Sequence, residues 1–179
     1  AVLAVARLAV ALDDVWQRRQ AAGEDLTVTV GQITTDPDEA SFSKIAGDVR
    51  FSLDVRSADP ATLAAMRDEV GAIVARIEAQ GRVRFDLGRL TASEPARMSP
   101  AVVSALGDAA RSAGVAHIEM PGGAGHDAAV FAREGVPTGM VFIRNAHGSH
   151  NPDEHMELSD FAETARLVTA LVQDPPPPR

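Results

Sequence analysis

The chain has 179 residues, of which 45% are apolar and 23% charged, a composition typical of a soluble globular protein with one or two domains. Its formal net charge of −8, its aromatic content of only 4% and its lack of tyrosine argue against nucleic-acid binding. The absence of cysteine excludes disulfides and thiolate metal sites, and it fits a cytoplasmic protein.

The first segment, residues 1–20, is predicted to form an amphipathic helix. Its apolar stretch contains Arg7, is too short and interrupted to span a membrane, and lacks the cationic start of a signal peptide. Because the helix has no N-cap and no initiator methionine, we expect part of the protein to lie upstream. The predicted apolar stripe comprises Leu3, Leu8, Leu12, Val15 and Trp16.

Three segments in which apolar and polar residues alternate, 26–30, 49–56 and 83–87, are predicted strands. Such alternation is typical of an antiparallel sheet with helices on one face. A helix is predicted between the second and third strands, with Asp59 as N-cap and Pro60 in its first turn. The order helix, strand, strand, helix, strand corresponds to an α+β ferredoxin-like unit that lacks its first strand.

The pattern changes after about residue 90. Ser99 and Pro100 are predicted to open a helix that ends near Gly114. A short strand is predicted at 117–120 and, after a glycine-rich turn, a helix at 127–133.

An apolar run at 139–143 does not alternate, which favours a strand buried on both faces of an α/β sheet. A loop, 144–157, follows it. Ser159 is predicted to cap a last amphipathic helix, and residues 175–179 to form an exposed proline-rich tail.

His126 ends the glycine-rich turn and precedes Asp127 at the start of a predicted helix. Glycine lets the backbone approach a ligand closely, and a helix N-terminus favours an anion or oxyanion. A plain turn with both side chains as caps explains the pattern equally well. The turn lacks the spacing of a dinucleotide fingerprint and the lysine of a phosphate loop, which argues against a nucleotide site.

His150 lies in the loop after the predicted buried strand, next to Asn151 and Pro152. Ligands gather at the carboxyl ends of strands in α/β sheets, and histidine is the commonest metal ligand. The alternative is an exposed loop histidine, which His147 and His155 of the same loop illustrate. His117 is interpreted as structural.

Arg56 ends the second predicted strand, on the face that also carries Asp54. From these residues alone, an ordinary charged surface is the simpler interpretation. A guanidinium is also the usual partner of a substrate carboxylate, so a binding role stays open.

Three stretches together resemble the hydantoinase/carbamoylase family of amidases. They are Gly-Ala-Gly-His-Asp-Ala at 123–128, Gly-Ser-His-Asn-Pro-x-Glu at 148–154, and Phe-Ser-Leu-Asp-Val-Arg at 51–56. The family includes N-carbamoyl-L-amino acid hydrolases, allantoate amidohydrolases and β-ureidopropionases, within a wider set of di-zinc aminoacylases and carboxypeptidase-like peptidases. The resemblance runs from about residue 1 to residue 173.

The resemblance implies an α/β catalytic domain interrupted by a lid domain that also forms the interface of a homodimer. Residues 1–90 would be the lid and dimerisation domain, incomplete at its N-terminus. Residues 91–174 would be the C-terminal part of the catalytic domain, followed by the tail at 175–179.

The resemblance also implies site residues. His150 resembles the family's C-terminal metal ligand, and Gly125 with His126 its pair that binds substrate and polarises the oxyanion. Arg56 resembles the lid arginine that grips the substrate carboxylate. Thirteen residues before it, where many members carry an asparagine that touches the substrate, this chain has Ser43, whose reach is shorter, so the exact substrate stays open.

The family's other metal ligands, bridging aspartate and catalytic glutamate precede the lid, and no matching His-x-Asp or Glu-Glu segment occurs here. We therefore expect the chain to be the C-terminal part of a longer enzyme and inactive by itself. The parent would hold two divalent ions, Zn or alternatively Mn, Ni or Co. It would hydrolyse the C–N bond of an N-carbamoyl amino acid or related ureido acid through a metal-bridged hydroxide.

Two alternatives stay open. One is an aminopeptidase or dipeptidase of the same wider clan, against which the Gly-Ala-Gly-His-Asp turn argues. The other is a non-catalytic dimerisation or binding module left by truncation.

Overall fold

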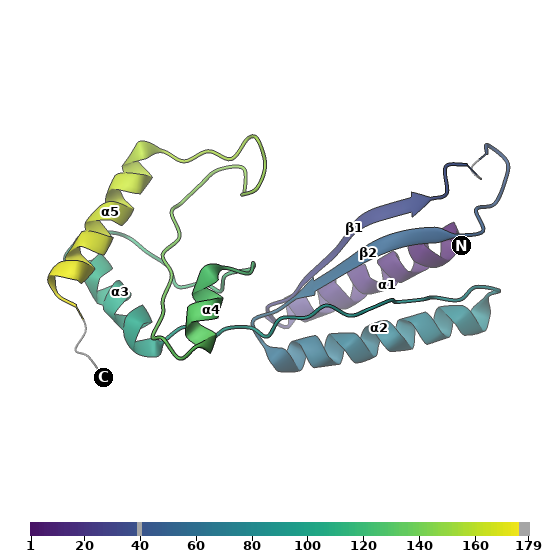
Figure 1. Cartoon of the computed structure of the whole chain (residues 1–179), viewed down its shortest axis with the longest axis horizontal. Coiled ribbons are helices and arrows are strands. Elements are labelled where there is room, and N and C mark those ends of the chain that lie inside the picture. The colour runs from purple at the N-terminus through teal and green to yellow at the C-terminus, as the bar shows by residue number, and fades with distance from the viewer. Residues whose placement is uncertain (39–40, 176–179) are drawn as a thin grey trace. The chain divides into compact units, whose positions relative to one another are not determined.

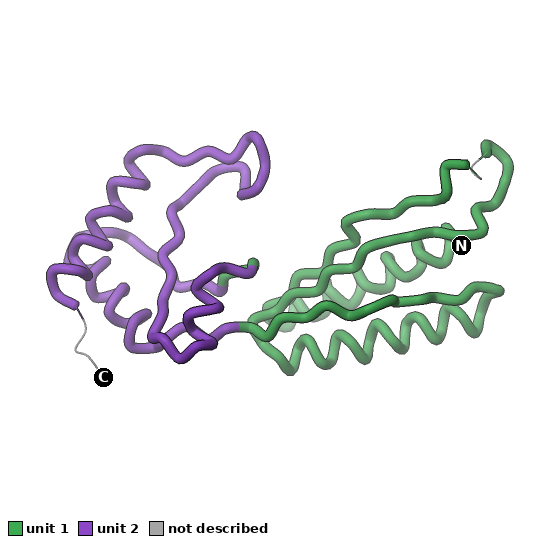
Figure 2. Tube along the Cα trace, viewed as in Figure 1, with its two compact units in different colours: residues 1–95, 122–124 green, residues 96–121, 125–179 purple. Residues whose placement is uncertain are grey.

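The computed structural model describes residues 1–38 and 41–175, which form two compact units (Figure 1). Figure 2 shows the described part of the first unit in green, within residues 1–95 and 122–124, and that of the second in purple, residues 96–121 and 125–175. The described part of the chain is a mixed α/β structure with five helices and one two-stranded antiparallel sheet. None of the described helices is long and apolar enough to cross a membrane.

The first unit consists of α1 (Val2–Ala21), β1 (Thr27–Thr35), β2 (Val49–Arg56) and α2 (Pro60–Gln80). The strands pair antiparallel, with Val28 opposite Val55, and a bulge interrupts the register between Val30 and Ile33. Residues of both helices form an apolar core, and one face of the β1–β2 hairpin packs against it. The buried members of this core are Ala4, Leu8, Leu12, Val15, Leu26, Met66, Val70, Ile73, Val74 and Ile77.

The helix predicted at residues 1–20 is confirmed, but its buried stripe differs at two positions. Leu3 is 73% exposed, whereas Ala4 is buried. Trp16 is partly exposed because it lies at the edge of the stripe, where its indole Nε1 donates to the Leu26 carbonyl at 3.0 Å. The edge position lets the ring pack while its polar atom finds a partner.

Local signals fix β2 and α2 as predicted. Along β2, half-buried apolar residues alternate with exposed polar residues over the whole strand. At the start of α2, the Asp59 carboxylate accepts from the backbone N–H groups of Ala61 at 3.1 Å and Thr62 at 3.2 Å, and Pro60 follows as the first helical residue. This is the arrangement that an N-cap and a following proline favour.

The strand predicted at residues 83–87 is wrong. Val83 and Phe85 do pack against the core, and the Phe85 ring meets Phe51 edge-on with centroids 6.2 Å apart. The Phe85 amide, however, donates to the Glu78 carboxylate at 2.6 Å instead of to a strand. The sheet of the described residues is therefore β1–β2 alone, and the ferredoxin-like order is reduced to helix, strand, strand, helix.

The second unit contains α3 (Pro100–Ser112), α4 (Asp127–Arg133) and α5 (Leu158–Gln173), with α3 packed on α5. All three helices were predicted. The expected cap of the last helix is wrong by two residues, because Glu157 rather than Ser159 precedes its first turn. Of the predicted tail at 175–179, residues 176–179 lie outside the described residues.

The strands predicted at 117–120 and 139–143 are not formed in the described part of this unit. A β-strand needs a neighbouring strand with which it forms backbone hydrogen bonds. The described residues of this unit make only one isolated β-bridge, between Ala146 and His155. The second segment is also not buried on both faces, since Phe142 is 46% exposed. Its start packs closely on α3, because a Cβ added at Gly139 would lie 2.8 Å from Val102 Cγ1.

Candidate functional site

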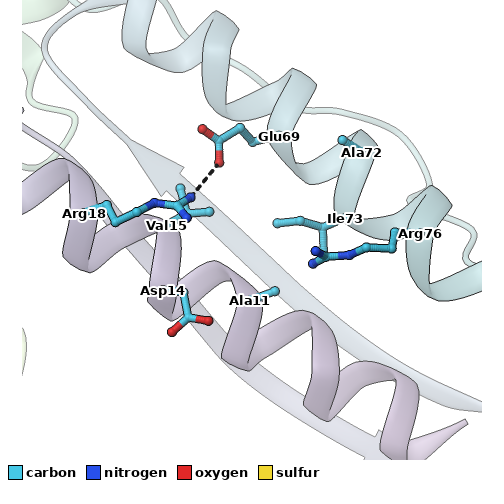
Figure 3. A pocket seen from close by; sticks show the side chains of 8 residues that line it. All are labelled: Ala11, Asp14, Val15, Arg18, Glu69, Ala72, Ile73 and Arg76. Atoms are coloured by element: carbon cyan, nitrogen blue, oxygen red, sulfur yellow. Dashed lines mark ion pairs between the residues drawn. The ribbon is translucent and has the colours of Figure 1, made fainter.

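A groove of about 260 Å³ lies between α1 and α2 in the first unit (Figure 3). At its rim an Arg18 guanidinium nitrogen lies 3.7 Å from a Glu69 carboxylate oxygen. None of the residues predicted to form the active site lines this groove, which is therefore separate from them. Its lining consists of Ala11, Asp14, Val15, Arg18, Glu69, Ala72, Ile73 and Arg76.

Arg56 lies at the last position of β2, on the polar face of the hairpin. Its Nε donates to the Asp54 carboxylate at 2.6 Å, and its Nη1 donates to the Gly123 carbonyl at 3.2 Å within the same unit. The guanidinium is about half exposed. Its other N–H groups have no partner among the described residues, so they can bind a carboxylate.

Ser43 lies in an exposed turn between β1 and β2, before β2 begins at Val49. Seven residue steps at about 3.3 Å place the start of β2 roughly 23 Å from Arg56 at its end. The structure therefore leaves Ser43 and Arg56 at opposite ends of the hairpin and does not bring them together.

His126 is the N-cap residue of α4, with extended backbone angles (φ −132°, ψ 158°). Its side chain makes no capping hydrogen bond, so the capping role that the sequence allowed is not used. The imidazole instead meets Phe142, with ring centroids 5.7 Å apart and planes at 61°. At Gly125 an added Cβ would contact no atom, so the space beside this backbone is open.

His150 lies in an exposed loop and has a left-handed backbone, with φ 62°. Its backbone N–H donates to Glu154 Oε2 at 3.0 Å. Asn145 Nδ2 donates to the other carboxylate oxygen of Glu154 at 3.2 Å and to the Gly148 carbonyl at 3.0 Å. The sequence places His150 in a loop, but nothing in its pattern predicts this network.

Arg144 ties the start of this loop to the first turn of α5. Its Nε donates to Asp160 Oδ1 at 3.0 Å, and its Nη2 donates to the same oxygen. These hydrogen bonds, together with the negative charge of Asp160, hold the pKa of Arg144 above its ordinary value.

The metal ligands needed beside His150 are not found among the described residues. No group of three His, Asp or Glu side chains in residues 1–38 and 41–175 could hold a metal ion. A protein metal site of this kind normally needs three or four ligands. These residues therefore do not form a complete metal centre by themselves, and no contact among them joins His126 to His150.

Three residues near the predicted site were given no role from the sequence. Glu154 belongs to the motif at 148–154, but its position in the sequence gives no signal that its carboxylate accepts from the His150 amide. Asn145 follows the apolar run, where an amide suits a turn. Phe142 lies within the run itself, and only the fold shows that it faces His126.

The sequence profile of peptidase family M20/M25/M40 matches residues 6–174. The chain belongs to this family. Within M20 it is 29% identical over 81% of its length to an N-carbamoyl-L-amino-acid amidohydrolase of Paenarthrobacter aurescens. It is 30% identical over 83% to an allantoate amidohydrolase of Bacillus subtilis. The chain spans 35% and 36% of these two relatives, about a third of their length.

Solved structures of amidases are also similar to this chain. A hydantoinase/carbamoylase family amidase from Burkholderia multivorans matches with a TM-score of 0.85 and 31% identity, over 97% of this chain and 41% of that one. A second, from Burkholderia ambifaria, matches with a TM-score of 0.81 and 28% identity, over 100% and 42%. These matches confirm the resemblance that the three motifs indicated.

Proposed function

We propose that this M20 chain is part of a hydrolase of linear amides. The enzyme would cleave the C–N bond of N-carbamoyl amino acids or related ureido acids. The observation that carries the proposal is the match to an M20 family whose relatives are named for such substrates. It is supported in the first unit by the unpaired N–H groups of Arg56 and in the second by the His126 side chain, which makes no capping hydrogen bond. We further propose residues 1–90 as a lid through which a homodimer forms.

Each proposed residue has a distinct task. The Arg56 guanidinium binds the substrate carboxylate. Its Nε donates to Asp54 and its Nη1 to the Gly123 carbonyl, which leaves its other N–H groups for the substrate. The His126 imidazole donates a hydrogen bond to the amide oxygen and stabilises the negative charge that develops on it. Gly125 leaves room for the substrate backbone beside that imidazole, and Ser43 supplies at most a peripheral contact.

A divalent metal, Zn or alternatively Mn, Ni or Co, is part of the proposal, with His150 as one ligand. Such an ion supplies Lewis acidity. Because the described residues do not complete its coordination, the ion's other ligands would have to come from elsewhere.

The test uses the protein expressed from the complete reading frame that contains these residues. It is supplied with each metal in turn and assayed against N-carbamoyl-L-amino acids, allantoate and dipeptides. We expect turnover of one or more ureido acids and none of dipeptides. Dipeptide hydrolysis without ureido turnover would replace the proposal by the aminopeptidase alternative.

The isolated 179-residue chain is the control. We expect it to show no hydrolysis with any of the four metals, because its described residues lack a complete metal centre. Measured turnover by this chain would show that the incomplete-site argument is wrong.

A further inference from the structure

His150 lies in a short loop that is closed at its base. The Ala146 amide donates to the His155 carbonyl at 2.8 Å, and the His155 amide donates back to the Ala146 carbonyl at 3.2 Å. The eight residues between them, 147–154, form a compact loop whose ends are fixed to each other. The backbone from which the His150 side chain projects therefore lies in a loop with a closed base.

Three residues of the loop have left-handed backbone angles: His147 with φ 67°, Gly148 with φ 73° and His150 with φ 62°. Glycine adopts such angles freely, whereas the Cβ of a histidine disfavours them. A loop of this shape needs interactions that hold the two histidines against their own preference.

Side chains of the loop supply those interactions. The Glu154 carboxylate accepts the His150 amide with one oxygen and the Asn145 side-chain amide with the other. Asn145 also donates to the Gly148 carbonyl, and Asn151 donates to the His147 carbonyl at 2.8 Å. Each of the three left-handed residues is thus bound through its own backbone by a side chain: the His147 carbonyl, the Gly148 carbonyl and the His150 amide.

We propose that Glu154, supported by Asn145, is a positioning residue that keeps the His150 backbone left-handed and thereby aims its imidazole. The use of that imidazole as a metal ligand rests on the proposed function; the positioning itself does not. Glu154 is exposed and belongs to no core, so its task is local to the loop.

Asp153 provides a matched control. It is an acidic neighbour in the same loop, but its carboxylate has no partner among the described residues, and only its backbone amide is bound, by Asn151. Asp153→Ala therefore removes the same charge as Glu154→Ala without removing the contact to His150.

The experiment is solution NMR on the full 179-residue chain without metal. In Glu154→Ala we expect the His150 amide to exchange about tenfold faster, as follows from losing a hydrogen bond to a charged acceptor. We also expect the strong amide-to-Hα cross-peak of a left-handed His150 to weaken. Asp153→Ala should leave both signals unchanged, and Glu154→Gln, which keeps one acceptor oxygen, should restore part of them.

The amide of Ala110 and the methyl groups of Leu167, both buried in the second unit, report whether the variants stay folded. Unchanged His150 signals in folded Glu154→Ala, or equal changes in Asp153→Ala, would overturn the proposal. Because neither substrate nor metal is used, absence of ureido hydrolysis leaves this result intact. A failed positioning test likewise leaves the substrate assay intact.

Discussion

The two compact units hold themselves together in different ways. In the first, one apolar cluster joins α1, α2 and the β1–β2 hairpin. In the second, the buried apolar side chains among the described residues are Ala109, Ala110 and Leu167 alone, while Phe131 and Phe161 are more than half exposed. The described part of the first unit therefore has a continuous apolar core, whereas that of the second has a much smaller one.

The larger apolar core lies in the first unit, whereas most of the proposed site residues lie in the second. Regions with few buried apolar contacts open more readily than well-packed ones. Gly125, His126 and His150 all belong to the second unit, and Arg56 and Ser43 to the first. We therefore expect core substitutions in the first unit to cost the most stability, and site substitutions in the second to cost activity at little cost in stability.

The largest expected effect is on the core of the first unit. Leu12 is 1% exposed, and Leu12→Ala is expected to lower the free energy of unfolding by about 2–5 kcal/mol, through lost burial and the cavity left behind. Denaturant unfolding followed by the fluorescence of Trp16, the single tryptophan, measures it. Leu3→Ala, at an exposed position of the same helix, should change little. Equal losses for the two variants would contradict the burial argument.

The next effect concerns His126 in the second unit. In the protein from the complete reading frame, His126→Ala is expected to lower kcat about 10²- to 10³-fold, as loss of an oxyanion donor does, with an unchanged unfolding midpoint. His117→Ala is the control and should keep kcat. A His126→Ala enzyme with normal kcat would remove His126 from the proposed site.

Arg56 tests the contribution of the first unit to binding. Because a hydrogen bond to a charged group contributes about 1.5–3 kcal/mol, Arg56→Ala should raise KM for a carboxylated substrate about 10- to 100-fold. Arg50→Ala changes an exposed arginine on the same face of β2 and should leave KM unaltered. If both variants kept the wild-type KM, the carboxylate-binding role of Arg56 would be wrong.

The smallest expected effect is the loss of unfolding free energy when the N-cap side chain of a helix is removed, compared between the two units. Asp59 accepts two backbone N–H groups at the start of α2, so Asp59→Ala is expected to cost about 1 kcal/mol of unfolding free energy. Ser99, at the same position of α3, makes no side-chain capping bond, and Ser99→Ala should cost less. Thermal unfolding of both variants provides the comparison, and the reverse order would show that cap contacts do not set these stabilities.

Features decided by neighbours in the sequence could be predicted. The cap at Asp59 and Pro60, the limits of α4 at 127–133 and the alternation along β2 all depend on residues a few positions apart. The segment at 83–87 alternates as clearly as β2, yet it is no strand. Alternation reports that one face is covered, whereas a strand also needs a hydrogen-bonding neighbour.

In the candidate site, too, the features carried by local motifs could be predicted, and those that depend on the fold could not. The motifs around His126 and His150 identify the family from the sequence, and the profile match confirms it. The contact of His126 with Phe142 depends on how α4 meets a segment about fifteen residues away, which no motif encodes. The left-handed angle of His150 is also hidden, because a non-glycine residue gives no signal of it. The roles of Arg56, Ser43, Gly125, His126 and His150 remain predictions.

The bridge between Ala146 and His155 has a consequence for the order of folding events. Closing a loop of about ten residues takes on the order of 10–100 ns, far less than the time in which a chain of about a hundred residues collapses. The bridge and the hydrogen bonds of Glu154, Asn145 and Asn151 all join residues between Asn145 and His155, so forming them needs no distant part of the chain. We therefore expect the ends of this loop to meet many times before α3 and α5 pack together.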